Sequence, residues 1–304
     1  MITGWSLEQP VSEEQFLRRE LGVDWQVDSA PSLAKKCRAA SPQRPLLLIC
    51  SEPDGYRELL DQAPTNSIVL IMLSDEAYTP ERLDLVRNAP ALRAIYRHYT
   101  LTLANPLTIV WQALLLVMQS IGTSVRPTAV LALLRIGRAT RSRMRAWQQV
   151  TTPVHVMPLG YTNRFAEGFV SLPTQRAVQQ PRQWQVVFRG AGGQPQRQVM
   201  LDRARRRRGA LIQVLGESWS GFDDAPGGDP YVEQLLDTEQ ALCPPGFINI
   251  ETFRAYEALL CGATPIEPRV ALTHGGKGVC TRTPQGVRQA LDDVRVALIR
   301  DTHA

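Results

Sequence analysis

The chain has 304 residues, of which 44% are hydrophobic and 21% are charged, and its formal net charge is +5. This length is too great for one small domain and accommodates two domains of about 150 residues, each able to bury a core. The excess of basic residues, mostly Arg, suits anionic partners: nucleotide diphosphates, phosphorylated acceptors, a lipid headgroup surface or nucleic acid.

Cysteine usage argues against disulfide-rich and zinc-binding proteins. The five cysteines are an odd number, are widely spaced and form no Cys-x-x-Cys pair. The N-terminal sequence soon becomes acidic and lacks the basic and then apolar pattern of a secretion signal. We therefore expect no metal site and a reducing, cytoplasmic location.

The first 44 residues show no single pattern of secondary structure. Ser12 and Gln15 form a capping box in front of Phe16 and Leu17, which predicts the start of a helix. Residues 28–44 are expected to lie at the surface.

Three strand-length apolar runs follow, and each ends in polar residues. Because the runs are rich in Ile, Val and Leu, they are typical of parallel strands buried on both faces. Helical patterns separate them, so this β-α-β-α-β series predicts a doubly wound sheet. The predicted strands are 46–50, 67–73 and 91–96, and the predicted helices are 56–62 and 80–88.

Polar side chains after the second and third runs are candidate catalytic groups. Asp75 and Glu76 follow residues 67–73, and His98 follows residues 91–96. The carboxyl ends of parallel strands meet at one edge of a sheet, where a carboxylate or an imidazole could take a proton from a hydroxyl. The alternatives are that Asp75 or Glu76 caps the next helix and that His98 is a packing or surface residue.

Residues 105–147 are predicted to be helical. The apolar part after Pro106 runs for only about 15 residues, short of the roughly 20 that span a membrane. The part from 126 to 145 is basic, with several Arg among Leu and Ile. Two interpretations remain: a helical hairpin packed on the first sheet, or a patch that lies on a membrane surface near a lipid-linked acceptor.

A short apolar strand at 154–158 is predicted to end the first domain, which spans residues 1–165. A linker is predicted at 166–182, where Gly, Pro and Gln are frequent. The second domain, 183–304, opens with a predicted strand at 184–188 and a glycine-rich turn. Glycines after a strand let the backbone approach a phosphate closely.

The helix after this turn ends in a run of arginines within residues 203–208. Cations suit the C-terminus of a helix. The alternative is a nucleic-acid surface, but no interleaved aromatic residues and no known motif accompany the run. Nucleic acid is therefore disfavoured as a partner.

Residues 240–266 predict a strand, a turn and a helix, the arrangement at which open parallel sheets bind ligands. The turn contains Pro245 and Gly246, and the helix begins at Asn249 or Thr252. A helix N-terminus offers unpaired N–H groups and the positive end of the dipole to an anion such as a diphosphate.

Arg254 and Glu257 lie one turn apart on this helix. The Arg could pair with a phosphate, and the Glu could accept hydrogen bonds from two sugar hydroxyls. The alternative is an ordinary helix ion pair, worth about 0.2–0.5 kcal/mol.

This stretch resembles the donor-binding signature of exostosin-like glycosyltransferases. It reads Cys-Pro-x-Gly, then an Arg followed three residues later by Glu-Ala-Leu, then Gly-x-x-Pro-Ile. It is most similar to the branch of ribitol-phosphate xylosyltransferases. The resemblance implies a GT-B architecture: two Rossmann-like α/β domains with the site in the cleft between them, and a final helix (283–299) that packs back on the first domain.

The resemblance also implies roles for particular residues. Glu257 would bind the nucleotide ribose or the sugar, while Arg189, Arg197 and Arg254 would face the phosphates. Asn249 stands where retaining GT-B enzymes often place an acid, which favours inversion. The other donor-binding candidates are Gly190, Pro245, Gly246 and Thr252.

The implied reaction moves a sugar from a nucleoside diphosphate sugar to a hydroxyl, without a metal or other cofactor. UDP-sugars are favoured as donors, and the acceptor would be a glycan, a polyol-phosphate or a lipid-linked molecule. A peripheral membrane contact would run through residues 105–147. The rival interpretation is a non-catalytic binding protein that uses its basic surface for an anionic polymer or a membrane.

Overall fold

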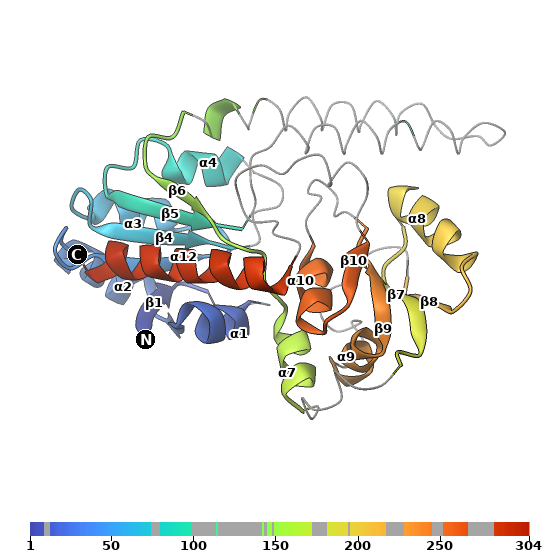
Figure 1. The fold of residues 1–304 in the computed structure, drawn as a ribbon. Helices are drawn as coiled ribbons and strands as arrows, with labels where there is room; N and C mark the ends of the chain where they lie inside the picture. Colours follow the sequence, from blue (N-terminus) through green and yellow to red (C-terminus); the bar gives the residue numbers. More distant parts are fainter. Residues whose placement is uncertain are drawn as a thin grey trace.

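The structure, a computed structural model, describes most of the chain. The described residues are 1–8, 13–73, 80–98, 114, 142, 145–147, 149–171, 181–193, 195–216, 228–244, 252–266 and 283–303. They form an α/β fold with two parallel β-sheets, one of six strands and one of four (Figure 1). The predicted α/β class is thus confirmed, and the two sheets are compatible with two Rossmann-like domains.

The six strands of the first sheet run parallel in the order β2-β1-β3-β4-β5-β6. All five residues of β4 are buried, as expected for a central strand covered on both faces. The strands predicted at 46–50, 67–73, 91–96 and 154–158 are confirmed. The strands are β1 (Ile2–Ser6), β2 (Val23–Val27), β3 (Leu46–Cys50), β4 (Ile68–Met72), β5 (Leu92–Arg97) and β6 (Val154–Val156).

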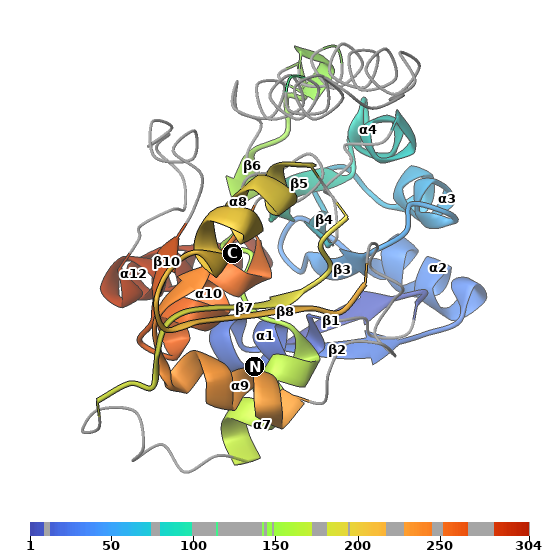
Figure 2. The same ribbon diagram turned by 90° about the vertical axis from the view of Figure 1, so that its right-hand side faces the viewer.

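Helices cover both faces of this sheet. In Figure 2, α2, α3 and α4 lie on one face and α1 and α12 lie on the other. The predicted helices at 56–62 and 80–88 are confirmed. The helices of this part are α1 (Glu14–Phe16), the π-helical turn η1 (Leu17–Leu21), α2 (Ala30–Ala39), α3 (Tyr56–Gln62), α4 (Pro80–Val86) and α12 (Pro284–His303).

The N-terminal strands and α2 are not predicted by the sequence pattern. Residues 28–44 were expected at the surface, yet α2 buries Leu33, Ala34 and Cys37 against the sheet. In β1, a Cβ atom on Gly4 would lie 2.5 Å from Ile49 Cδ1, so glycine allows the neighbouring strand to pack closely. Because β1 contains a glycine and its residues differ in burial, its sequence shows little of the hydrophobic periodicity that predicts a strand.

The second sheet has the parallel order β10-β9-β7-β8. The strand predicted at 184–188 is confirmed, as is the predicted helix, which has Thr252 as its N-cap residue. The strands are β7 (Trp184–Gly190), β8 (Ala210–Val214), β9 (Thr238–Leu242) and β10 (Thr264–Ile266), and the helices are α8 (Pro195–Arg205), α9 (Gly228–Leu236) and α10 (Phe253–Leu260).

Part of the predicted linker is a helix, α7 (Asn163–Ser171). Phe165 and Phe169 are four residues apart and stack with ring centroids 5.4 Å apart, which gives the helix an apolar face. α7 packs against α9. Residues 166–171 of the predicted linker are therefore helical, which the frequent Pro and Gln of the following residues do not lead us to expect, and the linker role of 166–182 stays a prediction.

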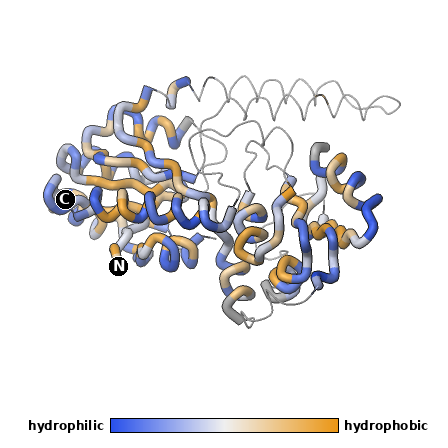
Figure 3. Tube along the Cα trace, viewed as in Figure 1, coloured by the Kyte–Doolittle hydropathy of each residue, from blue (hydrophilic) through white to orange (hydrophobic). Residues whose placement is uncertain are grey.

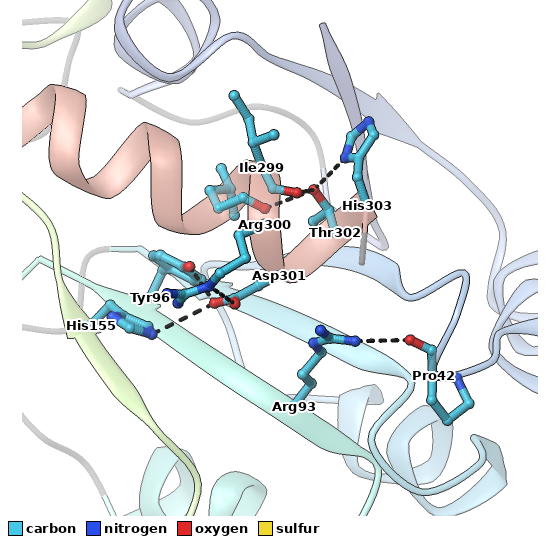
Figure 4. Close-up of polar contacts among 10 residues, drawn as sticks. Pro42, Arg93, Tyr96, His155, Ile299, Arg300, Asp301, Thr302 and His303 are labelled. Carbon is cyan, nitrogen blue, oxygen red and sulfur yellow. Dashed lines mark hydrogen bonds and ion pairs between the residues drawn. The ribbon is translucent and has the colours of Figure 1, made fainter.

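The C-terminal helix α12 returns to the first sheet, as expected (Figure 1). Its buried residues include Val294 and Leu298. The Tyr96 hydroxyl on β5 donates a 2.6 Å hydrogen bond to Asp301 Oδ2 on this helix (Figure 4). The last helix therefore completes the cover of the first sheet rather than the second.

One large apolar cluster holds most of the molecule together. It contains the buried side chains of β3, β4 and β5 and also Val232, Leu235, Ala241 and Ala258 from the second sheet and its helices. A smaller cluster around Val186, Phe188 and Leu201 fills the space between the second sheet and α8. Figure 3 shows the hydrophobic residues concentrated along the strands of both sheets.

Both sheets have a point at which the strand order reverses. In the first sheet it lies between β1 and β3, and in the second it lies between β7 and β9. Ligands of open α/β sheets bind outside the carboxyl ends of the strands at such a point. These two positions are therefore the first places to look for a site.

Several predictions concern residues outside the described ranges. They are the candidate catalytic residues Asp75 and Glu76, the donor candidates Pro245, Gly246 and Asn249, and nearly all of segment 105–147. None of the helices in the described ranges is both long enough and apolar enough to span a membrane.

Candidate functional site

The glycine-rich turn at the carboxyl end of β7 forms the centre of the candidate site. Gly190 has φ +152°, and a Cβ atom there would lie 2.5 Å from Arg254 Nη2. Backbone hydrogen bonds tie the turn to the end of β8: Gly192 N–H donates to Gly216 O (2.8 Å) and Leu215 N–H to Gly190 O (3.1 Å). Glycine at position 190 thus makes room for an arginine from another element.

Arg254 reaches this turn from the first turn of α10. Its Nη2 donates a 2.9 Å hydrogen bond to the carbonyl oxygen of Arg189, and its guanidinium lies 4.8 Å from the centroid of the Phe188 ring. Thr252 is the N-cap residue of α10, with extended backbone and no side-chain capping bond. Its hydroxyl is buried and makes no hydrogen bond to the described residues.

Arg189 and Arg197 approach the same turn from β7 and α8. Arg189 Nη1 donates to Gln213 Oε1 on β8 (2.8 Å), and Gln213 Oε1 also accepts from Gln234 Nε2 on α9 (3.1 Å). Arg197 Nη1 donates to the Ala191 carbonyl oxygen (3.0 Å). The predicted donor residues Arg189, Gly190, Arg197 and Arg254 are therefore brought together around one turn.

The electrostatics of this turn favour an anion. Within the described ranges, neither Arg189 nor Arg254 forms an ion pair, and the Nε atoms of both are buried without an acceptor. Burial lowers the pKa of Arg189, because a desolvated guanidinium loses the stabilisation of water. An oxyanion such as a phosphate would supply both the missing charge and the missing acceptors.

Glu257 is placed differently from these arginines. Its Oε1 accepts hydrogen bonds from Thr162 N–H (3.2 Å) and Thr162 Oγ1 (3.1 Å), and its Oε2 accepts one from the Tyr231 hydroxyl (2.8 Å). The residue is 4% exposed. Burial raises its pKa, while the hydrogen bonds and the charge of Arg254 act in the opposite direction.

Arg254 and Glu257 do not form the helix ion pair that their spacing allows. The Arg254 side chain turns to the Arg189 carbonyl, whereas Glu257 turns to Thr162 and Tyr231. The alternative interpretation of an ordinary i, i+3 ion pair is therefore wrong. Contact of Glu257 with a sugar or ribose remains a prediction.

His98 belongs to the other sheet, directly after β5. It is fully buried, and its ring lies edge-on to Phe16 with centroids 6.0 Å apart. Both ring nitrogens lack a hydrogen-bond partner among the described residues. Burial, and secondarily the charge of Arg97, lower the pKa of His98 to about 3, so the ring is neutral near pH 7. The surface alternative for His98 is wrong.

Some functional candidates could not be seen in the sequence pattern. Thr162, Tyr231 and Gln213 hold predicted site residues, but they contact them from distant parts of the chain. At the strand-order reversal of the first sheet, the Glu8 carboxylate accepts hydrogen bonds from the N–H groups of Ser51 and Glu52 (3.0–3.1 Å). The order of the strands brings Glu8 close to Ser51 and Glu52, and this order cannot be read from the sequence.

No group of three or more His, Cys, Asp or Glu residues suited to hold a metal ion occurs in the described ranges. Comparison with protein-family models and with curated proteins finds no match. The fold and the site define an α/β protein with two parallel sheets and an arginine-lined turn suited to an oxyanion.

Proposed function

We propose that this protein is a GT-B-type glycosyltransferase that takes a sugar from a nucleoside diphosphate sugar and transfers it to a hydroxyl. The proposal is carried by the guanidinium groups of Arg189 and Arg254 at the glycine-rich turn, beside the strand-order reversal of the second sheet. UDP-sugars are the favoured donors, and the favoured acceptors are a glycan, a polyol-phosphate or a lipid-linked molecule.

Sugar transfer leaves a nucleoside diphosphate with new negative charge on the departing oxygen. Preorganised donors aimed at such charge stabilise the transition state, and they lose little energy to reorganisation. Protein hydrogen bonds hold Arg189 and Arg254 in place, and in each the buried Nε–H has no acceptor among the residues that the structure describes. In our proposal these groups, with Arg197, stabilise the leaving diphosphate without a metal.

An inverting transfer also needs a base for the acceptor hydroxyl. The proposed candidates are Asp75, Glu76 and His98. His98 is neutral near pH 7, and its ring nitrogens have no partner among the described residues, but its ring is fully buried. The depressed pKa makes it a weak base, which leaves the two carboxylates as the alternatives.

The proposal is tested by the thermal stability of the purified protein with UDP, GDP, CDP and ADP in turn. A ligand at a hundred times its dissociation constant stabilises by about 2.7 kcal/mol, which raises the melting temperature by several degrees. We expect one nucleotide to raise it in the wild type and not in Arg254→Ala. The matched control is Arg203→Ala, because Arg203 is an exposed arginine on α8 outside the turn.

The absence of a shift with all four nucleotides, in a folded sample, would contradict the proposal. The second candidate is then the binding protein, which is favoured by the five arginines exposed at the end of α8 and just after it, Arg203, Arg205, Arg206, Arg207 and Arg208. Binding through that surface would be indifferent to nucleotide and would weaken steeply as salt is raised.

A further inference from the structure

Glu257 joins three elements at the base of the candidate site. It lies in the middle of α10, and its partners are Thr162, just before α7, and Tyr231 on α9. We infer that Glu257 is a positioning residue: it fixes α10, and with it Arg254, against α7 and α9, and it does not contact the bound ligand. This inference rests on the proposed nucleotide site and gives Glu257 a different role in it.

The hydrogen bonds leave Glu257 little capacity for a ligand. Three donors point at its two oxygens, at 2.8, 3.1 and 3.2 Å, and the residue is only 4% exposed. A ribose or sugar hydroxyl would have to displace protein donors that are themselves largely buried. Since unpaired buried donors are costly, that exchange would cost about as much as it gains.

The anchor is close enough to Arg254 to control its position. α10 has eight residues, and Arg254 and Glu257 are its charged residues. Holding Glu257 in the middle of so short a helix fixes the first turn, from which Arg254 reaches the Arg189 carbonyl. Because a Cβ atom on Gly190 would lie 2.5 Å from Arg254 Nη2, only a glycine at position 190 lets the guanidinium lie this close to the turn.

The surroundings of Glu257 also favour an anchor. Around the carboxylate lie the Tyr231 hydroxyl, the hydroxyl and N–H of Thr162, the positive charge of Arg254 and the Cys261 thiol. Burial and the neighbouring carboxylate raise the pKa values of Tyr231 and Cys261, so both stay neutral near pH 7. The hydrogen bonds from Tyr231 and Thr162 and the charge of Arg254 hold the buried carboxylate in its position.

The test compares Glu257→Gln, Tyr231→Phe and the double variant in the full-length protein. The matched control is Tyr96→Phe, which removes another buried tyrosine–carboxylate hydrogen bond, that of Tyr96 with Asp301. The first readout is amide hydrogen exchange at Gly192 and Ala255, whose N–H groups donate to Gly216 O and Thr252 O. The second readout is the dissociation constant of the nucleotide that binds the wild type.

We expect exchange at both amides to rise in Glu257→Gln, by about tenfold for the loss of one buried partner. The rise should be smaller in Tyr231→Phe and absent in Tyr96→Phe. Adding Tyr231→Phe to Glu257→Gln should change little, because the two substitutions break the same contact. The nucleotide dissociation constant should rise in the same order.

Two results would overturn the inference. One is a fall in the melting temperature of Glu257→Gln with no change in exchange at Gly192 or in nucleotide affinity. This result would mean that Glu257 stabilises the fold without positioning the turn. The other is weaker nucleotide binding in Glu257→Gln, with unchanged binding in Tyr231→Phe and unchanged exchange. This result would mean that Glu257 contacts the nucleotide directly. If the wild type binds no nucleotide, the proposed function fails, but exchange at Gly192 still decides whether Glu257 positions the turn.

Discussion

At the scale of single residues, His98 is the most unusual group. Its imidazole is neutral and fully buried, and neither ring nitrogen has a hydrogen-bond partner in the described part of the chain. Such a group costs stability that an apolar side chain would not. Its position after β5 places it at the carboxyl edge of the first sheet. Because open parallel sheets bind ligands at this edge, a role in binding or catalysis is one explanation for an unsatisfied buried group there.

The depressed pKa of His98 predicts how stability depends on pH. The folded-state pKa is about 3 and the ordinary value is 6.5, so the unfolded chain binds a proton between these values and the folded chain does not. The ring is neutral in both states above pH 6.5, and the folded state loses stability relative to the unfolded chain as pH falls from 6.5 toward 3. By linkage this difference of about 3.5 between the two pKa values corresponds to a loss of about 5 kcal/mol.

We expect the melting temperature of the wild type to fall more steeply below pH 6.5 than that of His98→Phe, which cannot titrate. His303→Ala is the control, because His303 is exposed near the C-terminus. Melting curves from pH 8 to pH 4 measure the difference. Parallel curves for the wild type and His98→Phe would show that His98 does not titrate in a buried site.

The arginines of the turn could be predicted from the sequence, but their partners could not. Arg189, Arg197 and Arg254 were expected near a phosphate because of a motif, and they lie around one turn. The Thr162–Glu257 contact joins residues far apart in the chain, which no local pattern encodes. Motifs identify residue types, whereas the direction of each side chain depends on the packing of the folded chain.

At the scale of elements, predictability follows burial. β3, β4 and β5 are covered on both faces, so their sequences are continuous apolar runs that predict strands. β1 and β2 include Thr, Gly, Asp and Gln and have mixed burial, so their strand character depends on the pairing of β2 with β1 and of β1 with β3. Tertiary context therefore decides the elements that the pattern misses.

The C-terminal helix α12 provides a test at this scale. Asp301 accepts the Tyr96 hydroxyl and lies 3.6 Å from His155 Nε2 (Figure 4). Replacing Asp301 by Ala leaves the buried Tyr96 hydroxyl without its acceptor, which costs about 1–3 kcal/mol. We expect the free energy of unfolding, measured by urea denaturation, to fall by this amount.

The matched control is Asp292→Ala on the same helix, because Asp292 is exposed. Such surface substitutions change stability by about 0.5 kcal/mol or less. Equal effects of the two substitutions would mean that the Tyr96 contact does not fasten α12 to the first sheet. A large loss with Asp301→Ala alone would support the role of α12 as a fixed cover of that sheet.

At the scale of the whole molecule, the two sheets are not independent. The main apolar cluster contains side chains of the first sheet together with Val232 and Leu235 from α9 and Ala255, Tyr256 and Ala258 from α10. The Thr162–Glu257 hydrogen bonds add a polar connection between the segment after β6 and α10. A shared core couples the stability of its parts.

We therefore expect one cooperative unfolding transition, in which the calorimetric and van't Hoff enthalpies agree. Leu235→Ala is the informative substitution, because Leu235 lies on α9 beside the second sheet, is 1% exposed and belongs to the shared cluster. Loss of a buried leucine costs about 2–5 kcal/mol, and in a shared core it should move the whole transition to lower temperature. Leu260→Ala, at a position that is 40% exposed, is the control and should move it little. Two separate transitions, of which Leu235→Ala lowers only one, would show that the sheets unfold as separate units.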